Sequence, residues 1–160
     1  LLKAESFGLS GAESPTELEA NEALKDKVEA IRLAAGKQMN LGDVSNKTVP
    51  KMSLISPALH GGLLNTRTFI PHRVQEAIGV LGSVSVATAC VLKGTIASDL
   101  VKKTFNESAM AIEVEHPTGQ FTVEMEVSDS HDIGKFCVKR AALLRTARLL
   151  MRGEAMFALK

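Results

Sequence analysis

Residues 15–39 have the apolar and polar pattern of a long amphipathic helix. Apolar residues recur at spacings of three or four, and the charged residues lie largely on the other side. A helix start precedes them: Ser14 can cap the helix, Pro15 suits the first helical position, and Glu17 completes a capping box. The polar, turn-rich residues 42–50 predict a loop after this helix.

Three other segments have the composition of short strands. Residues 51–56 and 63–70 are strand-like and are separated by a proline and a pair of glycines. Near the C-terminus, residues 135–145 could form a strand, whereas residues 141–152 could equally form a helix. Short apolar runs do not distinguish these two structures, so both readings stay open.

Residues 109–116 and 120–127 alternate between apolar and polar side chains around the turn sequence Pro117-Thr-Gly119. Alternation with a period of two places one set of side chains on each face of a strand. Glu113 and Glu115 then share the face opposite the apolar residues. The pattern predicts a β-hairpin with one face in water.

The stretch GVLGSVSVATAC, residues 79–90, lies in a run from Ala77 to Leu92 that has no charged residue. Lys93 and Gly94 then provide a typical helix end. A helix that is apolar on every face has to be enclosed by protein. The sequence therefore predicts an α+β fold, in which a curled, barrel-like antiparallel sheet wraps around this central helix and the long amphipathic helix is added.

Composition narrows the classes of function. The 160 residues are 45% hydrophobic and 23% charged, as in an ordinary soluble domain. The net charge is +1 and the two signs are interspersed, so we expect no binding to nucleic acid or to a membrane surface. The longest uncharged run is shorter than the roughly 20 apolar residues that span a membrane.

The cysteines and histidines indicate neither a disulfide framework nor a metal site. Cys90 and Cys137 are the only cysteines, and we expect both in the core. The absence of a leader and of a Cys-x-x-Cys pair leads us to expect a reducing, cytoplasmic location. The four histidines have no ligand spacing, so we expect no metal, and no sequence feature supports a Ser-His-Asp triad.

The start of the apolar helix is the candidate binding site. The first N–H groups of a helix lack internal partners and carry a partial positive charge, which suits a carboxylate or a phosphate. Gly79 and Gly82 would let a ligand approach the backbone, and Ser83 and Ser85 add hydroxyl donors. The alternative is structural, with glycines for tight packing and serines as caps. The spacing fits neither a P-loop nor a dinucleotide fingerprint, which disfavours nucleotide binding.

Four segments carry a set of motifs: LSGAESP at 9–15, the stretch at 70–95, EHPTG at 115–119 and RTARLLMRGE at 145–154. In this order they resemble the C-terminal half of the 2-methylaconitate cis-trans isomerases of the PrpF type. That family has an LTGxExP junction before a long helix, an HPxG hairpin and a terminal RTARxLMxGE. The likeness spans most of the chain.

The resemblance implies a diaminopimelate-epimerase-like fold, in which two similar domains each wrap a sheet around a central helix and face each other across a cleft. Residues 1–50 would be the interdomain junction and connecting helix, and residues 51–160 the C-terminal barrel domain. The N-terminal half of the same protein would be a partner that is absent from this chain, which agrees with a start at Leu1. A homodimer is also compatible with the resemblance.

The resemblance further implies a cofactor-independent isomerase that shifts a proton along an allylic system. Its substrate would be a small di- or tricarboxylate, such as methylaconitate, aconitate or a methylitaconate-like acid. Gly79, Gly82 and Ser83 would bind one substrate carboxylate at the helix start, where N–H dipoles stabilise negative charge that develops on it. His72 would donate to a second carboxylate.

Position 85 departs from the family. The family commonly reads Thr-Gly-Ala-Val-Cys where this chain reads Leu81-Gly-Ser-Val-Ser85, so a hydroxyl replaces a potential thiolate base. Serine ionises far above neutral pH, so without an activating partner Ser85 is a hydrogen-bond donor at the catalytic position. The base would come from the missing half, which favours an isomerase over a racemase and predicts that the chain alone is inactive. The alternative is a non-catalytic binding or scaffold domain that keeps the fold.

Overall fold

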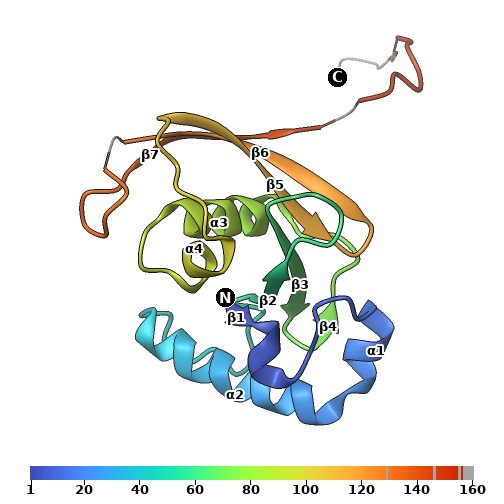
Figure 1. Ribbon diagram of the computed structural model, residues 1–160. Coiled ribbons are helices and arrows are strands. Elements are labelled where there is room, and N and C mark those ends of the chain that lie inside the picture. Colours follow the sequence, from blue (N-terminus) through green and yellow to red (C-terminus); the bar gives the residue numbers. More distant parts are fainter. Residues whose placement is uncertain (129, 146, 155, 157–160) are drawn as a thin grey trace.

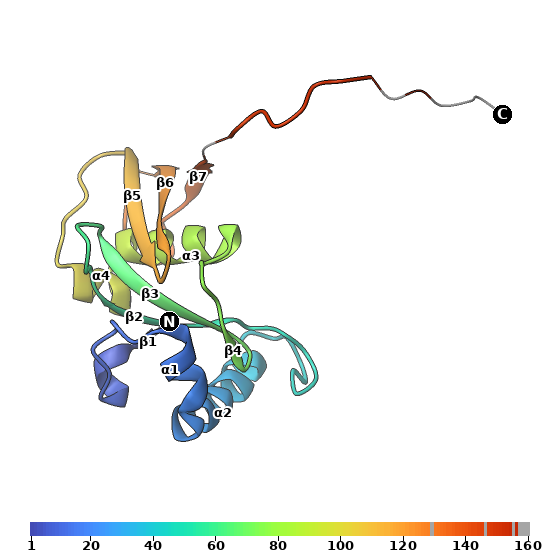
Figure 2. The ribbon, with the colours of Figure 1, turned by 90° about the vertical axis from the view of Figure 1, so that its right-hand side faces the viewer.

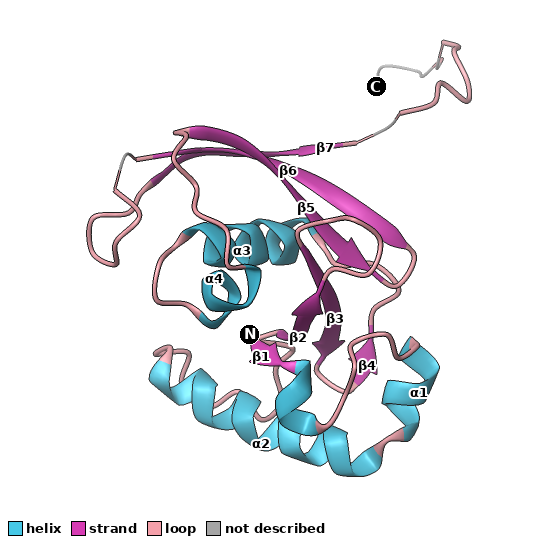
Figure 3. Ribbon diagram, viewed as in Figure 1, coloured by secondary structure: helices cyan, strands magenta, loops and turns pink. Residues whose placement is uncertain are grey.

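The computed structural model describes residues 1–128, 130–145, 147–154 and 156. The fold is mixed α+β, with helices packed against both faces of a sheet (Figure 1 and Figure 3). In chain order the elements are β1 (Leu2–Lys3), the 3-10 helix η1 (Ala4–Phe7), α1 (Pro15–Ala20), α2 (Glu22–Gln38), β2 (Met52–Pro57), β3 (Leu64–Ile70), β4 (Arg73–Val74), α3 (Val80–Val91), α4 (Ile96–Val101), β5 (Ala109–His116), β6 (Gly119–Val127) and β7 (Val138–Leu144).

The helix predicted at 15–39 is two helices, α1 and α2, that meet at Asn21. The capping box is confirmed, because Ser14 accepts a hydrogen bond from the Glu17 N–H and the Glu17 carboxylate accepts one from the Ser14 N–H. At Asn21 the backbone leaves helical geometry, and the Asn21 side chain caps α2 by accepting from the Leu24 N–H at 3.0 Å. The pattern missed this break because an apolar stripe continues through it, while asparagine competes for backbone hydrogen bonds.

The sheet is mixed and open, so the prediction of an antiparallel, barrel-like sheet is wrong in these two respects. The strand order is β1-β2-β3-β5-β6-β7, and β4 pairs with β3. β1 is parallel to β2 and β3 is parallel to β5, whereas the other pairs are antiparallel. The connection from β3 to β5 carries α3 and α4, and such a crossover brings the chain back in the same direction. Within the described ranges β7 does not pair with β1, which leaves the sheet unclosed.

Two apolar cores lie on opposite faces of β2 and β3. On one face α3 packs against the sheet around Leu64 and Val86, and on the other α1 and α2 pack around Phe69. In Figure 2 the two strands separate α3 and α4, above, from α1 and α2, below. The apolar helix α3 thus faces the sheet. Its first turn is not enclosed, because Val80 is 51% and Leu81 is 82% exposed.

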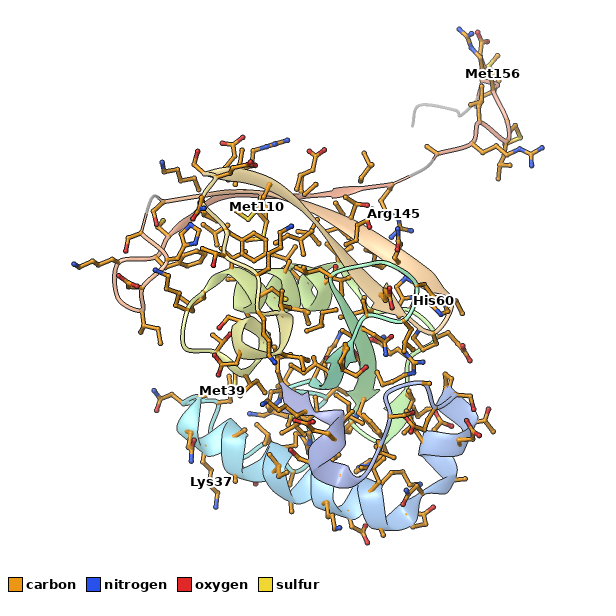
Figure 4. All side chains as sticks on the ribbon, in the orientation of Figure 1. Lys37, Met39, His60, Met110, Arg145 and Met156 are labelled. Carbon is orange, nitrogen blue, oxygen red and sulfur yellow. The ribbon has the colours of Figure 1, made fainter. Side chains whose placement is uncertain are left out.

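The predicted hairpin is confirmed as β5 and β6, but its polar face is not wholly in water. Glu115, expected in solvent, is 1% exposed. Its carboxylate accepts hydrogen bonds from the N–H groups of Leu59 at 2.6 Å, His60 at 2.8 Å and Gly62 at 2.8 Å. Burial alone would raise the pKa of Glu115, but the three donors outweigh it and the pKa lies below the ordinary value. Glu115 therefore holds the connection between β2 and β3, where His60 is labelled in Figure 4.

The segment at 135–145 is a strand, β7, and not a helix. The described residues that follow it, 147–152, are not helical, and residue 146 lies outside the described residues. Cys137 just before β7 is exposed, so the prediction of a core position was wrong for this residue. Beyond β7 the chain leads away from the two cores to Met156, which is 92% exposed (Figure 4). Within the described ranges, no helix is both long and apolar enough to cross a membrane.

Candidate functional site

The start of α3 differs from the starts of the other α-helices in the described chain. Ser14, Asn21 and Thr95 each cap a helix by accepting a hydrogen bond from a backbone N–H. The N-cap of α3 is Gly79, which has extended geometry and no side chain to do this, and the first turn of α3 has no acidic residue. The unpaired N–H groups of this turn therefore keep their partial positive charge.

A cavity of about 700 Å³ reaches this helix start. Its walls are mostly apolar and come from α2, the loop after α2, β2 and α3, with the chain start beside them. Met39, labelled in Figure 4 at the end of α2, belongs to one wall. The polar side chains along the cavity are Lys51, Ser53, Thr68, Gln75 and Ser85. Such a cavity can hold a small acid with its carboxylate at the helix start and its carbon skeleton against apolar side chains.

The structure brings three of the predicted site residues together. Gly79, Gly82 and Ser85 all line the cavity, because they follow one another at three-residue spacing from the N-cap of α3 into the helix. The Ser85 hydroxyl donates to the Leu81 carbonyl at 2.8 Å. Its oxygen can still accept a hydrogen bond, but its hydrogen is already used.

The other two predicted residues do not line the cavity. Ser83 is fully buried and its hydroxyl donates to the Val80 carbonyl at 2.9 Å, within the helix. His72 is exposed in the turn between β3 and β4 and is not among the residues that line the cavity. It lies near enough to α2 to help lower the pKa of Glu29, which the Arg32 guanidinium lowers most through its hydrogen bonds. The Ser83 hydroxyl is used by carbonyls at the helix start itself, and neither Ser83 nor His72 lines the cavity.

The two glycines have different surroundings. A Cβ atom added at Gly79 would meet nothing within 4 Å, so this position is open toward the cavity. A Cβ atom at Gly82 would lie 2.9 Å from Cγ1 of Ile78, which is closer than real Cβ contacts allow. Gly82 therefore allows close packing against Ile78, in addition to any effect on a ligand.

The turn of the β5–β6 hairpin contacts the segment that leads into α3, a connection that the sequence reading did not foresee. The Thr118 hydroxyl donates to the Glu76 carbonyl at 2.9 Å and lies 3.3 Å from Nδ1 of His116. His116 is 8% exposed, and this burial lowers its pKa. The EHPTG motif marks this turn in the sequence, but it does not indicate the contact with Glu76, which lies 42 residues away along the chain.

Few groups at the cavity can exchange a proton. Lys51 carries the one titratable side chain among the lining residues. Cys90, further along α3, is 1% exposed, and burial raises the pKa of its thiol to about 12. In the part of the chain that the structure describes, no three His, Cys, Asp or Glu side chains are grouped so that they could hold a metal ion. The described site thus offers donors to an anion but no carboxylate or imidazole base.

The sequence is similar to several named isomerases. It is 51% identical over 153 residues to the 4-oxalomesaconate tautomerase of Pseudomonas putida, covering 96% of this chain and 40% of that protein. It is 48% identical over 153 residues to the (4E)-oxalomesaconate Delta-isomerase of Novosphingobium sp., covering 96% of this chain and 41% of that protein. The chain therefore spans about two fifths of the length of these relatives.

Two further comparisons concern the fold and the family. The crystal structure of a methylitaconate-delta-isomerase matches with a TM-score of 0.70 and 20% identity, over 94% of this chain and 42% of that chain. At this identity the match shows a shared fold. The sequence profile described as "PrpF protein" matches residues 1–158, so the chain belongs to the PrpF family.

Proposed function

We propose that this chain is the C-terminal part of an isomerase that moves a proton along an allylic system in a small unsaturated di- or tricarboxylate. The observation that carries the proposal is the uncapped start of α3 at an apolar cavity. The relatives named as oxalomesaconate isomerases, and the fold shared with a methylitaconate isomerase, support the same class of substrate. Methylaconitate, aconitate and methylitaconate-like acids also fit this description.

In the proposed reaction a base removes a proton from the carbon next to a substrate carboxylate. The C–H electron pair becomes part of a dienolate, and the carboxylate next to it gains negative charge. The free N–H groups at the start of α3 would stabilise this charge in a site that excludes water. The double bond then shifts by one position, and a proton is delivered to the far allylic carbon.

The base is proposed to come from a part of the protein outside this chain. Ser85 ionises far above neutral pH and uses its hydrogen to bond the Leu81 carbonyl, so it can at most accept a hydrogen bond from the substrate. The thiol of Cys90 is buried and has a pKa of about 12. On this proposal, residues 1–50 connect the two halves, residues 51–160 form the C-terminal domain, and the chain alone is inactive.

A second candidate is a non-catalytic domain that binds small acids. The absence of a carboxylate or imidazole among the cavity-lining residues favours it. The two candidates make different predictions for exchange of substrate protons with solvent.

Proton NMR in deuterium oxide tests the proposal. This chain and the complete polypeptide to which we assign it are incubated separately with 4-oxalomesaconate, trans-aconitate and methylitaconate. We expect deuterium incorporation or new isomer signals with the complete polypeptide and neither of these with the 160-residue chain. Exchange catalysed by this chain would locate a base within its 160 residues. No exchange by either protein with any of the three acids would favour the non-catalytic domain.

A further inference from the structure

A row of three polar side chains crosses three neighbouring segments at the cavity. Ser53 on β2 pairs with Thr68 on β3, and their hydroxyl oxygens are 2.8 Å apart. The backbone N–H of Gln75, directly after β4, donates to the Thr68 carbonyl at 2.9 Å. All three residues line the same cavity as Gly79 and Gly82. We refer to Ser53, Thr68 and Gln75 as the polar row.

The polar row has hydrogen-bonding groups that the described chain does not satisfy. Oε1 of Gln75 is buried, and no donor lies within hydrogen-bonding distance of it in the described ranges. In the pair of Ser53 and Thr68, one hydroxyl donates to the other, so one hydroxyl hydrogen remains for another acceptor. A buried carbonyl without a donor is costly, because it has lost its bond to water. The row therefore contains an acceptor and a donor that have no partner in the described chain, on residues that line one cavity.

A hydroxyl group is the ligand group that matches this combination. A carboxylate only accepts hydrogen bonds and cannot satisfy Oε1 of Gln75. A hydroxyl or an enol can donate to Oε1 and accept from the free hydroxyl of Ser53 or Thr68. The remaining walls of the cavity are mostly apolar, with Lys51 and Ser85 as the other polar side chains.

We propose that the polar row is a subsite for a hydroxyl or enol group of the substrate, and that Gln75 determines specificity by accepting its hydrogen bond. The inference rests on the proposed function for the placement of the substrate carboxylate at the start of α3. It adds that, among unsaturated polycarboxylates, those that present a hydroxyl or an enol are preferred.

Equilibrium binding of two acids that differ by one hydroxyl tests this subsite without turnover. Citrate carries a hydroxyl on the carbon where tricarballylate carries hydrogen, and both have three carboxylates. Calorimetric titration of the complete polypeptide should give about tenfold tighter binding of citrate, as expected for one well-placed hydrogen bond. Gln75→Met has a similar size but no acceptor, and should reduce the preference to less than about twofold.

Gln120→Met is the matched control, because it makes the same change at an exposed position on β6 outside the cavity. It should keep the preference for citrate. Gln75→Glu keeps an acceptor oxygen, so it should also keep the preference while weakening binding of both acids by charge repulsion. If Gln75→Met does not fold, Gln75→Leu decides the question, because it also removes the acceptor and should reduce the preference to less than about twofold.

Thermal unfolding adds a readout that does not depend on a ligand. Removing an unpaired buried acceptor should raise the Tm of the Gln75→Met protein above that of the wild type. A lower Tm would mean that Gln75 has a partner in the complete protein, and it would overturn the inference. Equal binding of citrate and tricarballylate by the wild type would also overturn it.

The failure of the subsite and the failure of the proposed function give different results. If the wild type catalyses proton exchange but does not distinguish citrate from tricarballylate, the isomerase stands and the subsite falls. If it catalyses no exchange but loses a clear preference for citrate on Gln75→Met, the subsite stands and the isomerase falls.

Discussion

Glu115→Gln is expected to destabilise the fold strongly, although it removes no apolar contact and changes the side-chain volume little. The carboxylate of Glu115 is buried and holds three N–H groups of the connection between β2 and β3. A glutamine at this position keeps one oxygen and replaces the other with a donor. The result depends on which oxygen serves which N–H group.

The two oxygens of Glu115 have different partners. Oε1 accepts from His60 and Gly62, and Oε2 accepts from Leu59. In the variant, two hydrogen bonds to a charged acceptor become bonds to a neutral one, each weaker by about 1 kcal/mol. The new NH₂ group faces the Leu59 N–H, and a buried unpaired donor costs about 1–3 kcal/mol. The expected loss is about 3–5 kcal/mol of unfolding free energy, or about 6–20 °C in Tm for a chain of this size.

Urea unfolding of the chain at pH 7, followed by circular dichroism, measures this loss. Glu113→Gln on the same strand is the control, because in the described part of the chain its side chain makes no hydrogen bond or ion pair. It should change the unfolding free energy by less than about 0.5 kcal/mol. A Glu115→Gln loss no larger than that of the control would refute the reasoning.

The difference in unfolding free energy between the wild type and Glu115→Gln should depend on pH. The folded-state pKa of Glu115 is lowered, so its contribution is fully present above the unfolded-state pKa of about 4.3. It is lost as the pH falls from there through the folded-state pKa. The difference between wild type and Glu115→Gln should therefore shrink below about pH 4.3, and a difference that stays constant would contradict the assignment.

Two further predictions concern α3. Gly82→Ala should lower the unfolding free energy by about 1–2 kcal/mol, because the new Cβ atom would lie 2.9 Å from Ile78 Cγ1. Gly79→Ala has open space at its Cβ position and should lower the unfolding free energy by less than about 1 kcal/mol. Equal losses of unfolding free energy for the two variants in urea would contradict this packing argument. Iodoacetamide at pH 8 should alkylate Cys137, which is exposed, and leave Cys90 unmodified, because Cys90 is buried and its thiol has a pKa of about 12. Mass spectrometry of the peptides measures the labelling, and alkylation of Cys90 in preference to Cys137 would contradict the prediction.

The parts of the fold that could be predicted from the sequence depend on neighbouring residues. The capping box of Ser14 and Glu17 joins residues three apart, and the β5–β6 hairpin follows from alternation around a short turn. The burial of Glu115 could not be predicted, because its donors lie 53 to 56 residues away along the chain. The parallel pairing of β3 with β5 likewise follows from where the crossover packs and not from either strand alone.

The candidate site also has residues that could be placed from the sequence and residues that could not. Gly79, Gly82 and Ser85 could be assigned to one place because helical periodicity alone puts them on one face of α3. His72 could not be placed, because its position depends on the short turn before β4 and on the packing of α2. Gln75 gave no signal as a single amide in a loop, and its significance appears only beside Ser53 and Thr68, which come from two other strands.

The start of α3 lacks the side-chain cap that the other described α-helices have. The chain caps its other described α-helices with Ser14, Asn21 and Thr95, and such a cap stabilises a helix by about a few tenths of a kcal/mol more than glycine does. At α3 it uses Gly79 and leaves Oε1 of Gln75 unpaired along the same cavity. Local rules are broken together here, with unpaired donors at the helix start and an unpaired acceptor on Gln75, which lines the same cavity. Functional sites are where a sequence tolerates such losses, because a ligand supplies the missing partners.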